Sequence, residues 1–226
     1  MCYSAQASFA ASGALAVGSV AISRLPKAKA GVPLSLFPAI FAAHQFIEGL
    51  IWLNHNGVLP DAYRPAAVYA YVLIAYVLWP VFVPFSAYLL ETDRRRRTII
   101  LFCQVVGLGV GVSLLLAALR QPVAVSADCC SLSYGVNAPY LLVVPYLVAV
   151  SIPFLLSSQK SLVLFGVGIV VSCAAAAIAA SAAEFPSLWC FLAALLSAGL
   201  YLHFRATTRV TAHSSAPGAT AQPVTG

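Results

Sequence analysis

The hydrophobic residues of the chain fall into long apolar runs that recur along nearly its whole length. Runs of about 18 or more apolar residues are long enough to cross ~30 Å of hydrocarbon as an α-helix. Strands of a membrane barrel would instead alternate apolar and polar residues at a period of two, and these runs do not. The pattern therefore predicts an all-α bundle of seven transmembrane helices. They are expected at residues 7–23, 33–54, 64–91, 98–119, 139–156, 160–183 and 186–206.

The composition points to the same class of protein. Of the 226 residues, 62% are hydrophobic and 8% are charged, whereas a soluble domain usually carries about a quarter charged residues. The net charge of +6 does not indicate nucleic-acid binding, because the basic residues stand at the ends of apolar segments. Lipid headgroups and membrane topology explain that placement better. The predicted partner is the lipid bilayer, with no nucleic acid.

The two ends of the chain have different characters. The first eight residues, MCYSAQAS, lack the basic region of a secretory signal, so the first apolar run is expected to be a retained helix. After Arg205 the composition changes to Ala, Thr, Ser, Pro and Gly, from which no core can form. We therefore expect a transmembrane domain over residues 1–206 and a disordered cytoplasmic tail over residues 207–226.

Positive charge is unevenly divided between the predicted loops. If the chain crosses seven times, ten of its 12 Lys and Arg residues fall on one side, and only Arg64 and Arg120 fall on the other. Because basic loops remain in the cytoplasm, this division places the N-terminus outside and the C-terminus in the cytoplasm. The ten residues are Arg24, Lys27, Lys29, Arg94, Arg95, Arg96, Arg97, Lys160, Arg205 and Arg209.

Prolines and glycines indicate how the helices bend and pack. Five prolines inside the predicted helices remove backbone donors, so kinks are expected there. Gly107 and Gly111 form a GxxxG spacing, which lets neighbouring backbones approach closely. That spacing suits either packing within one chain or a homo-oligomer that forms through these two glycines. The prolines are Pro38, Pro80, Pro84, Pro145 and Pro153.

The stretch HQFIEGLIWL, residues 44–53, places two ionisable side chains in an apolar setting. On a helix, His44 and Glu48 share one face, and Gln45 adjoins it. Ionisable groups at such depth usually face the interior of a bundle or a wet cavity. One interpretation is structural, with Glu48 protonated or hydrogen-bonded to His44. The other is a site for a ligand, a proton or a metal ion.

More polar residues gather on the predicted outer side of the membrane, above Glu48. They lie at the N-terminus, at the end of the second helix and in the stretch SADCCSLSYGVN, residues 126–137. An outward-opening pocket with Glu48 and His44 at its floor is the economical model. The other residues expected to line it are Gln45, Asn54, His55, Tyr3 and Ser4.

Three of the six cysteines share this outer face: Cys2, Cys129 and Cys130. An oxidising exterior would allow Cys2 to form a disulfide with Cys129 or Cys130. The thiols could equally remain free, or Cys2 could join His44 and Glu48 as ligands of a transition metal. CxxC and HxxxH spacings are both absent from the sequence, so the signal for a metal site is weak and its further ligands would have to come from distant segments.

Several familiar mechanisms are excluded. The lysines, Lys27, Lys29 and Lys160, all lie at helix ends, so a retinal Schiff base inside the last helix is not available. The sequence also lacks a P-loop, a nucleophile elbow and a Rossmann glycine fingerprint. The glycines of GLGVGV, residues 107–112, lie inside a predicted membrane helix.

Two motifs carry a resemblance to a known family. The opening MCYSAQASFAASG and the stretch HQFIEGLIWL resemble a family of short multi-pass bacterial membrane proteins that begin Met-Cys-Phe-Ser-Ala and carry Ile-Glu-Gly in the second helix. Tyr3 takes the place of the phenylalanine. That family has no assigned activity, so the resemblance implies no catalytic residues. It implies a multi-pass protein of the bacterial inner membrane in which the N-terminal motif belongs with Glu48.

Three classes of function remain compatible with these features. The first is binding or movement of a small solute or proton, with Glu48 changing its protonation and His44 adjusting the affinity. The second is a membrane enzyme in which His44, Glu48 and Cys2 hold a transition metal. The third is a membrane sensor or scaffold subunit.

Overall fold

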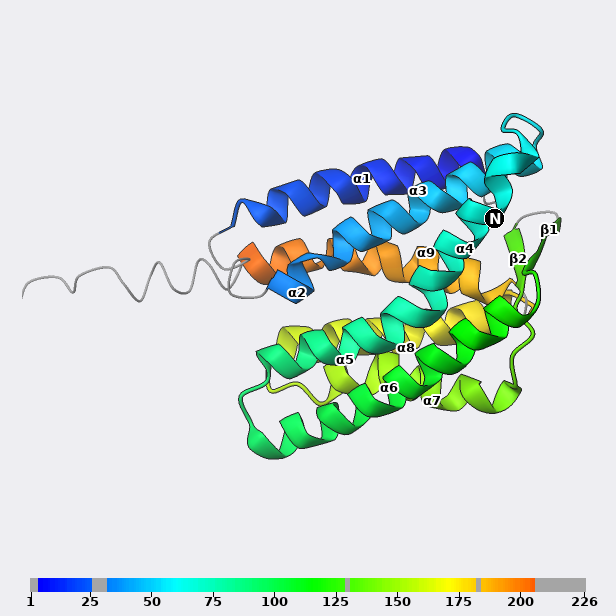
Figure 1. Ribbon diagram of the computed structural model, residues 1–226. Helices are drawn as coiled ribbons and strands as arrows, with labels where there is room; N and C mark the ends of the chain where they lie inside the picture. The colour runs from blue at the N-terminus through cyan, green and yellow to red at the C-terminus, as the bar shows by residue number, and fades with distance from the viewer. Residues whose placement is uncertain (1–3, 26–31, 129–130, 182–183, 206–226) are drawn as a thin grey trace, which may run out of the picture.

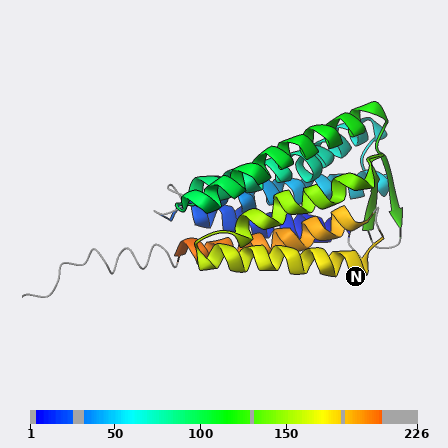
Figure 2. The same ribbon diagram turned by 90° about the horizontal axis from the view of Figure 1, so that it is seen from below.

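The computed structural model describes residues 4–25, 32–128, 131–181 and 184–205, and it shows a helical bundle with a small β-hairpin at one end (Figures 1 and 2). The α-helices are α1 (Ala5–Ser23), α2 (Val32–Ser35), α3 (Phe37–His55), α4 (Arg64–Val72), α5 (Trp79–Leu90), α6 (Arg94–Arg120), α7 (Val143–Leu155), α8 (Lys160–Ala179) and α9 (Phe185–Ala198). Shorter pieces are the 3₁₀ turns η2 (Asp61–Tyr63) and η4 (Tyr140–Leu142) and the π-helical stretch η3 (Leu73–Leu78). The hairpin strands are β1 (Ala124–Asp128) and β2 (Ser131–Gly135).

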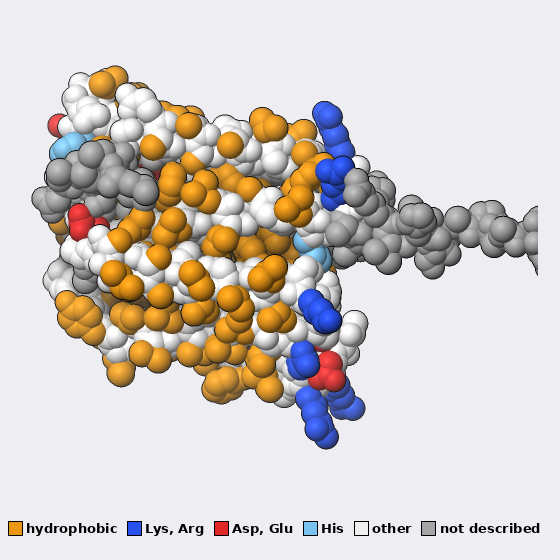
Figure 3. Space-filling model, turned by 180° about the vertical axis from the view of Figure 1, so that it is seen from behind, with side chains coloured by type: hydrophobic (Ala, Val, Ile, Leu, Met, Phe, Trp, Pro, Cys, Tyr) orange, Lys and Arg blue, Asp and Glu red, His pale blue; other side chains and the backbone are white. Residues whose placement is uncertain are grey.

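Six helical stretches are long and apolar enough to cross a membrane. Apolar side chains cover the sides of the bundle, and most Lys and Arg side chains gather at the end opposite the hairpin (Figure 3). The chain is therefore a membrane-embedded helical protein. Its remaining apolar stretch, Tyr140–Leu155, is shorter than the other six. The six stretches are Ala5–Ser23, Pro33–His55, Asp61–Leu90, Arg94–Arg120, Lys160–Ala179 and Phe185–Arg205.

Proline residues interrupt two of the expected helices. The second expected helix is divided into α2 and α3, with Leu36 between them and Pro38 in the first turn of α3. The third expected helix is continuous from Arg64 to Leu90, but it widens into the π-helical stretch η3 just before Pro80. Pro80 cannot donate a backbone hydrogen bond, and a π-helical turn is one way in which a helix absorbs such a missing bond.

The β-hairpin corrects the prediction of an all-α protein. Strands β1 and β2 pair antiparallel, with Val125 opposite Tyr134 and Ala127 opposite Leu132. These four apolar residues alternate with polar ones, which is the period-two pattern of a strand. From the sequence, this segment was assigned only as a polar stretch between two membrane helices. In the structure, Leu132, Ser133 and Tyr134 are buried against the helices.

Gly107 and Gly111 are used for packing within the chain. A Cβ atom added to Gly107 would lie 1.8 Å from the carbonyl oxygen of Pro80, and one added to Gly111 would lie 3.3 Å from that of Val77. Helix α6 thus approaches η3 and α5 at backbone distance, as small residues permit. These two positions are buried within the chain, and the oligomer contact considered from the sequence stays a prediction.

Glu91 joins two turns at the end of the bundle opposite the hairpin, where most Lys and Arg side chains lie and which we call the basic end. Its side chain is 3% exposed and accepts hydrogen bonds from the backbone N–H groups of Thr92 and Asp93, in the turn between α5 and α6. It also accepts bonds from the N–H and the hydroxyl of Ser158, in the turn between α7 and α8. Nearby, the Arg96 guanidinium donates to the carbonyl oxygens of Leu156 and Ser157 at 3.0 Å. One carboxylate therefore fixes the spacing of four helices.

The buried apolar residues form two clusters. The larger one fills the middle of the bundle and its basic end, around the rings of Phe37, Trp79 and Phe154. The smaller one lies under the hairpin and includes Trp52 and Tyr71. The buried polar residues described next lie beside this smaller cluster.

Candidate functional site

Helix α3 carries three polar side chains on one buried face. His44 and Gln45 are each 0% exposed, and Glu48 is 2% exposed. Four residues make slightly more than one helical turn, so His44 and Glu48 lie one above the other. Burying such groups is costly unless they find hydrogen-bond partners. Their partners therefore decide what this face can do.

The carboxylate of Glu48 is bound by a hydroxyl and an amide. Ser187 Oγ donates to Oε1 of Glu48, and Gln45 Nε2 donates to Oε2 at 3.2 Å. Ser187 lies in the first turn of α9, 139 residues away along the chain. His44 does not hydrogen-bond to Glu48, so the His44–Glu48 bond considered from the sequence is not formed. Among the described residues, no cation pairs with this carboxylate.

Three aromatic rings from three segments form a column beside the acid. The imidazole of His44 stacks on the ring of Tyr71 in α4, with 4.2 Å between the ring centroids. The other face of Tyr71 meets Tyr134 of the hairpin at 4.1 Å, and those two rings are 6° from parallel. Burial raises the pKa of the Tyr134 hydroxyl well above its usual value, so this group stays neutral and can donate a proton to a hydrogen bond.

Several polar atoms of this column are buried without a hydrogen-bond partner of good geometry. These atoms are the two ring nitrogens of His44, Oε1 of Gln45 and the hydroxyl oxygens of Tyr71 and Tyr134. Buried polar groups in proteins are nearly always paired with protein or with ordered water. These atoms thus offer both donors and acceptors to a small guest. We call His44, Gln45, Glu48, Tyr71, Tyr134 and Ser187 the polar column.

The two side chains expected at the floor of an open pocket, Glu48 and His44, are buried in this structure. Neither of them lines the hollows bordered by α5, α6, α7 and α9. The hairpin accounts for the difference, because it places Leu132 and Tyr134 over the outer end of the column. The opening expected above Glu48 stays a prediction, because Cys2 and Tyr3 at the N-terminus lie outside the described residues.

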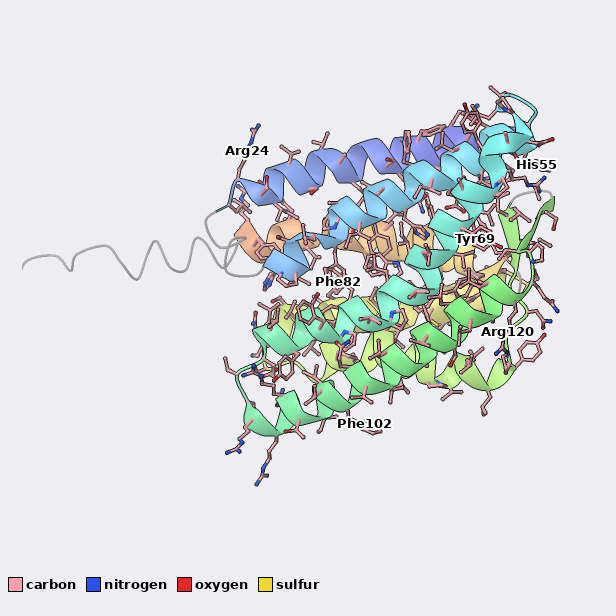
Figure 4. The ribbon with its side chains drawn as sticks, in the orientation of Figure 1. Arg24, His55, Tyr69, Phe82, Phe102 and Arg120 are labelled. Atoms are coloured by element: carbon pink, nitrogen blue, oxygen red, sulfur yellow. The ribbon has the colours of Figure 1, made fainter. Side chains whose placement is uncertain are left out.

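The other residues expected at the pocket have local contacts. Ser4 caps the start of α1 by accepting a bond from the Ala7 N–H at 3.3 Å. Asn54 is buried, and its side-chain amide donates to Leu59 O and to Asp61 Oδ1. His55 is exposed at the hairpin end of α3 (Figure 4). Tyr3 lies outside the described residues.

The metal site and the disulfide were both predicted to involve residues that are not described. Cys2, Cys129 and Cys130 all lie outside the described ranges. Within those ranges, His, Cys, Asp and Glu side chains do not come together in groups of three or more that could hold a metal ion. His44 and Glu48 alone therefore do not make a metal centre. The described cysteines, Cys103, Cys173 and Cys190, are free thiols.

Comparison with known proteins places the chain in a family. A family model described as "Family of unknown function (DUF6629)" matches residues 1–216. The chain belongs to DUF6629. This confirms the membership of a family without an assigned activity that the two motifs suggested. Searches of curated proteins and of solved structures found no match to the chain.

The DUF6629 match includes every residue of the polar column, since it extends from residue 1 to residue 216. The sequence of this DUF6629 protein pointed to His44, Gln45 and Glu48 and placed the stretch that contains Tyr134 above them, but it missed Tyr71 and Ser187. Tyr71 lies in a tyrosine-rich run, YAYVLIAY, and Tyr134 lies in the alternating pattern of β2. Ser187 follows a proline at the start of a helix. Each is a detectable local signal, but none shows which distant residue it meets.

Proposed function

We propose that the polar column binds a proton or a small hydrogen-bonding solute at Glu48, and that the guest reaches it from the hairpin end. The observation that carries this proposal is a buried carboxylate held by two neutral donors, next to unpartnered imidazole and phenol groups. A charged carboxylate in such a place is poorly compensated. Glu48 therefore favours binding of a proton, or of a small solute that supplies further hydrogen-bond donors.

The residues of the polar column have different roles in the proposed site. Ser187 and Gln45 hold the Glu48 carboxyl in a fixed orientation. His44 is free to donate or to accept, because its ring nitrogens have no partner of good geometry. Tyr134 closes the column, so the hairpin has to move for a solute to enter. Loops and small elements over a binding site commonly move in this way.

Replacing Glu48 with Gln should remove one buried carboxylic acid from the infrared spectrum of the protein. The full chain is reconstituted in lipid and its carbonyl bands are followed as the pH changes. In the wild-type protein, we expect a protonated-carboxyl band that responds to pH and to a bound solute. The variant should lack that band, because an amide cannot titrate.

The matched control is Asp61→Asn, which removes an exposed acid at the same end of the bundle. It should leave the buried-acid band unchanged. An identical pH response in wild type and Glu48→Gln would contradict the proposal, because it would show that Glu48 does not exchange protons with solvent.

We also propose seven membrane crossings, with the hairpin end outside and the basic end in the cytoplasm of a bacterial inner membrane. The seventh crossing is Tyr140–Leu155, whose 16 residues would extend for about 24 Å as a helix. A crossing this short is accommodated by local thinning of the bilayer. The division of charge supports this orientation, and residues 207–226 would form a cytoplasmic tail.

The orientation can be tested with single cysteines and a membrane-impermeant maleimide on intact cells. Val58 is exposed in the turn that follows α3, and Arg95 is exposed at the basic end. Val58→Cys should be labelled in intact cells, whereas Arg95→Cys should be labelled only after permeabilisation. Peptide mapping separates these sites from the native thiols. The reverse labelling pattern would show that the orientation is inverted.

A further inference from the structure

Three hollows follow one another from the hairpin end toward the middle of the bundle, and no residue of the polar column lines them. The outermost, which we call the mouth, is a surface hollow bordered by Arg120, Gln121 and Asn137. The second, the tail cavity, has a volume of about 180 Å³ and lies between α6, α7 and α9. The third, the inner cavity, has a volume of about 40 Å³ and lies among the rings of the larger apolar cluster.

Shared walls place the three hollows in series. Ala138 and Leu142 line both the mouth and the tail cavity. Tyr146, Trp189 and Cys190 line both the tail cavity and the inner cavity. Tyr146 is held at this junction because its hydroxyl donates to Ala75 O at 2.5 Å. A flexible chain that enters at the mouth therefore has a continuous sequence of walls to follow.

The two deeper hollows are apolar. Their lining includes aliphatic and aromatic side chains such as Leu114, Leu147 and Trp189, and it includes no charged side chain. An apolar cavity of about 150 Å³ takes up benzene, so the tail cavity holds roughly six to eight carbons of a single chain. A volume of about 180 Å³ is too small for a pair of acyl chains lying side by side.

The mouth has a free positive charge. Arg120 ends α6 and is exposed, and among the described residues its guanidinium has no ion-pair or hydrogen-bond partner. The other described arginine at the hairpin end, Arg64, is already used, because it donates to Val125 O at 2.5 Å. Arg24 lies at the opposite end of the bundle (Figure 4). Beside Arg120, the side chains of Asn137 and Gln121 are hydrogen-bonded at 3.0 Å.

We propose that this series of hollows binds a single-chain anionic amphiphile, with its head on Arg120 and its tail in the tail cavity. A guanidinium matches the geometry of a carboxylate or a phosphate. The mouth lies where a helix end meets the membrane surface, so a lipid-phase molecule can present its head to Arg120 and its chain to Leu142. This site is separate from the polar column and does not depend on the function proposed for it.

The test uses palmitic acid with a mid-chain diazirine as the probe, added to the full chain in nanodiscs. After illumination, labelled peptides are mapped by mass spectrometry. We expect labels at Leu142–Leu147 and at Pro186–Cys190, which line the tail cavity. Ala138→Trp, which blocks the junction with the mouth, should lower this labelling, and Ala175→Trp on the exposed face of α8 should not.

The head is tested by competition with unlabelled palmitate, the fatty alcohol of the same length, and lysophosphatidic acid. Arg120→Gln should weaken competition by palmitate about tenfold, and Arg24→Gln should leave it unchanged. Competition by the fatty alcohol should be the same in the wild-type protein and in Arg120→Gln. Better competition by lysophosphatidic acid than by palmitate would assign the head as a phosphate, and the reverse would assign it as a carboxylate. Both results support the proposal.

Two results would overturn it. Labels spread over lipid-facing residues such as Leu164 and Ile178 would show that the probe lies in the bilayer and not in the cavity. Equal competition by the alcohol and palmitate, unchanged in Arg120→Gln, would show that no anionic head is bound. Arg120 is exposed, so its variant tests the head even if Ala138→Trp does not fold.

Discussion

Gly107→Ala should be among the most destabilising single-methyl substitutions in this bundle. A Cβ atom at this position would lie 1.8 Å from the carbonyl oxygen of Pro80 and 3.3 Å from the Cβ of Ala149. The obstacle is backbone, so it cannot move aside as a flexible side chain would. Overpacking usually costs about 1–3 kcal/mol and occasionally more, and we expect the upper part of that range.

The close approach at Gly107 is explained by a proline one turn further along α5. Pro84 has no N–H group, so the carbonyl of Pro80 lacks its usual helical donor. The hydrogen of Gly107 that occupies the Cβ direction points at that oxygen and can form a weak Cα–H···O contact. Gly107 is therefore needed both for space and for the contact.

Gly109→Ala is the matched control, since a Cβ added there meets nothing within 4 Å. Alanine also favours the helix relative to glycine by about 1 kcal/mol, so this control should be neutral or stabilising. Denaturant or thermal unfolding in a fixed detergent measures both variants. Equal stability of the two variants would mean that α6 and α5 are further apart than the structure shows.

Glu91→Ala should also lower the free energy of unfolding strongly, because four hydrogen bonds to one buried carboxylate are lost. Hydrogen bonds to charged groups contribute about 1.5–3 kcal/mol each, and they are not additive. We expect a total loss of about 3 kcal/mol. Size-exclusion chromatography should show whether the α5–α6 and α7–α8 turns still hold together.

The same residue predicts a pH dependence. Burial alone would raise the pKa of Glu91, but the hydrogen bonds from Asp93, Ser158 and Thr92 outweigh it and lower the pKa. A group with a lowered pKa stabilises the folded state above its unfolded value of about 4.3. That stabilisation is lost as the pH falls through the folded-state pKa.

Glu91→Gln should therefore flatten the loss of stability in acid, because the amide does not titrate. Asp93→Asn is a suitable control, since asparagine can still cap α6 by accepting from the Arg96 N–H. This control keeps the hydrogen bonds from the Thr92 and Asp93 N–H groups to Glu91, so the acid-dependent loss that Glu91 causes should remain. An unchanged acid profile in Glu91→Gln would assign the pH dependence to another carboxylate.

The membrane helices could be predicted from the sequence because length and apolar content suffice to identify them. Helical structure makes up about 81% of the described residues, and the six long spans lie within a few residues of the expected ones. The hairpin was missed because its pattern is short and competes with turn-forming residues. The break at Leu36 and the π-helical stretch depend on how proline neighbours repack, which is a tertiary effect.

Only part of the candidate site could be predicted from the sequence. The helical period shows that His44 and Glu48 share a face, since that is a local property of α3. It does not show that Ser187, and not His44, bonds to the acid, because that choice depends on how α9 packs on α3. The stack of Tyr71 on His44 likewise depends on a contact between separate helices.

The distance along the chain between Glu48 and Ser187 affects how the protein is made. At synthesis rates of about 5–20 residues per second, the 139 residues between them take about 7 to 28 seconds to emerge from the ribosome. During that interval, α3 has to enter the bilayer without the hydroxyl that later binds its acid. Glu48 must then enter the bilayer either as the protonated acid or hydrogen-bonded to water. Biogenesis of this protein thus requires the membrane insertion machinery to accept an incomplete polar helix and to retain it until the last helix arrives.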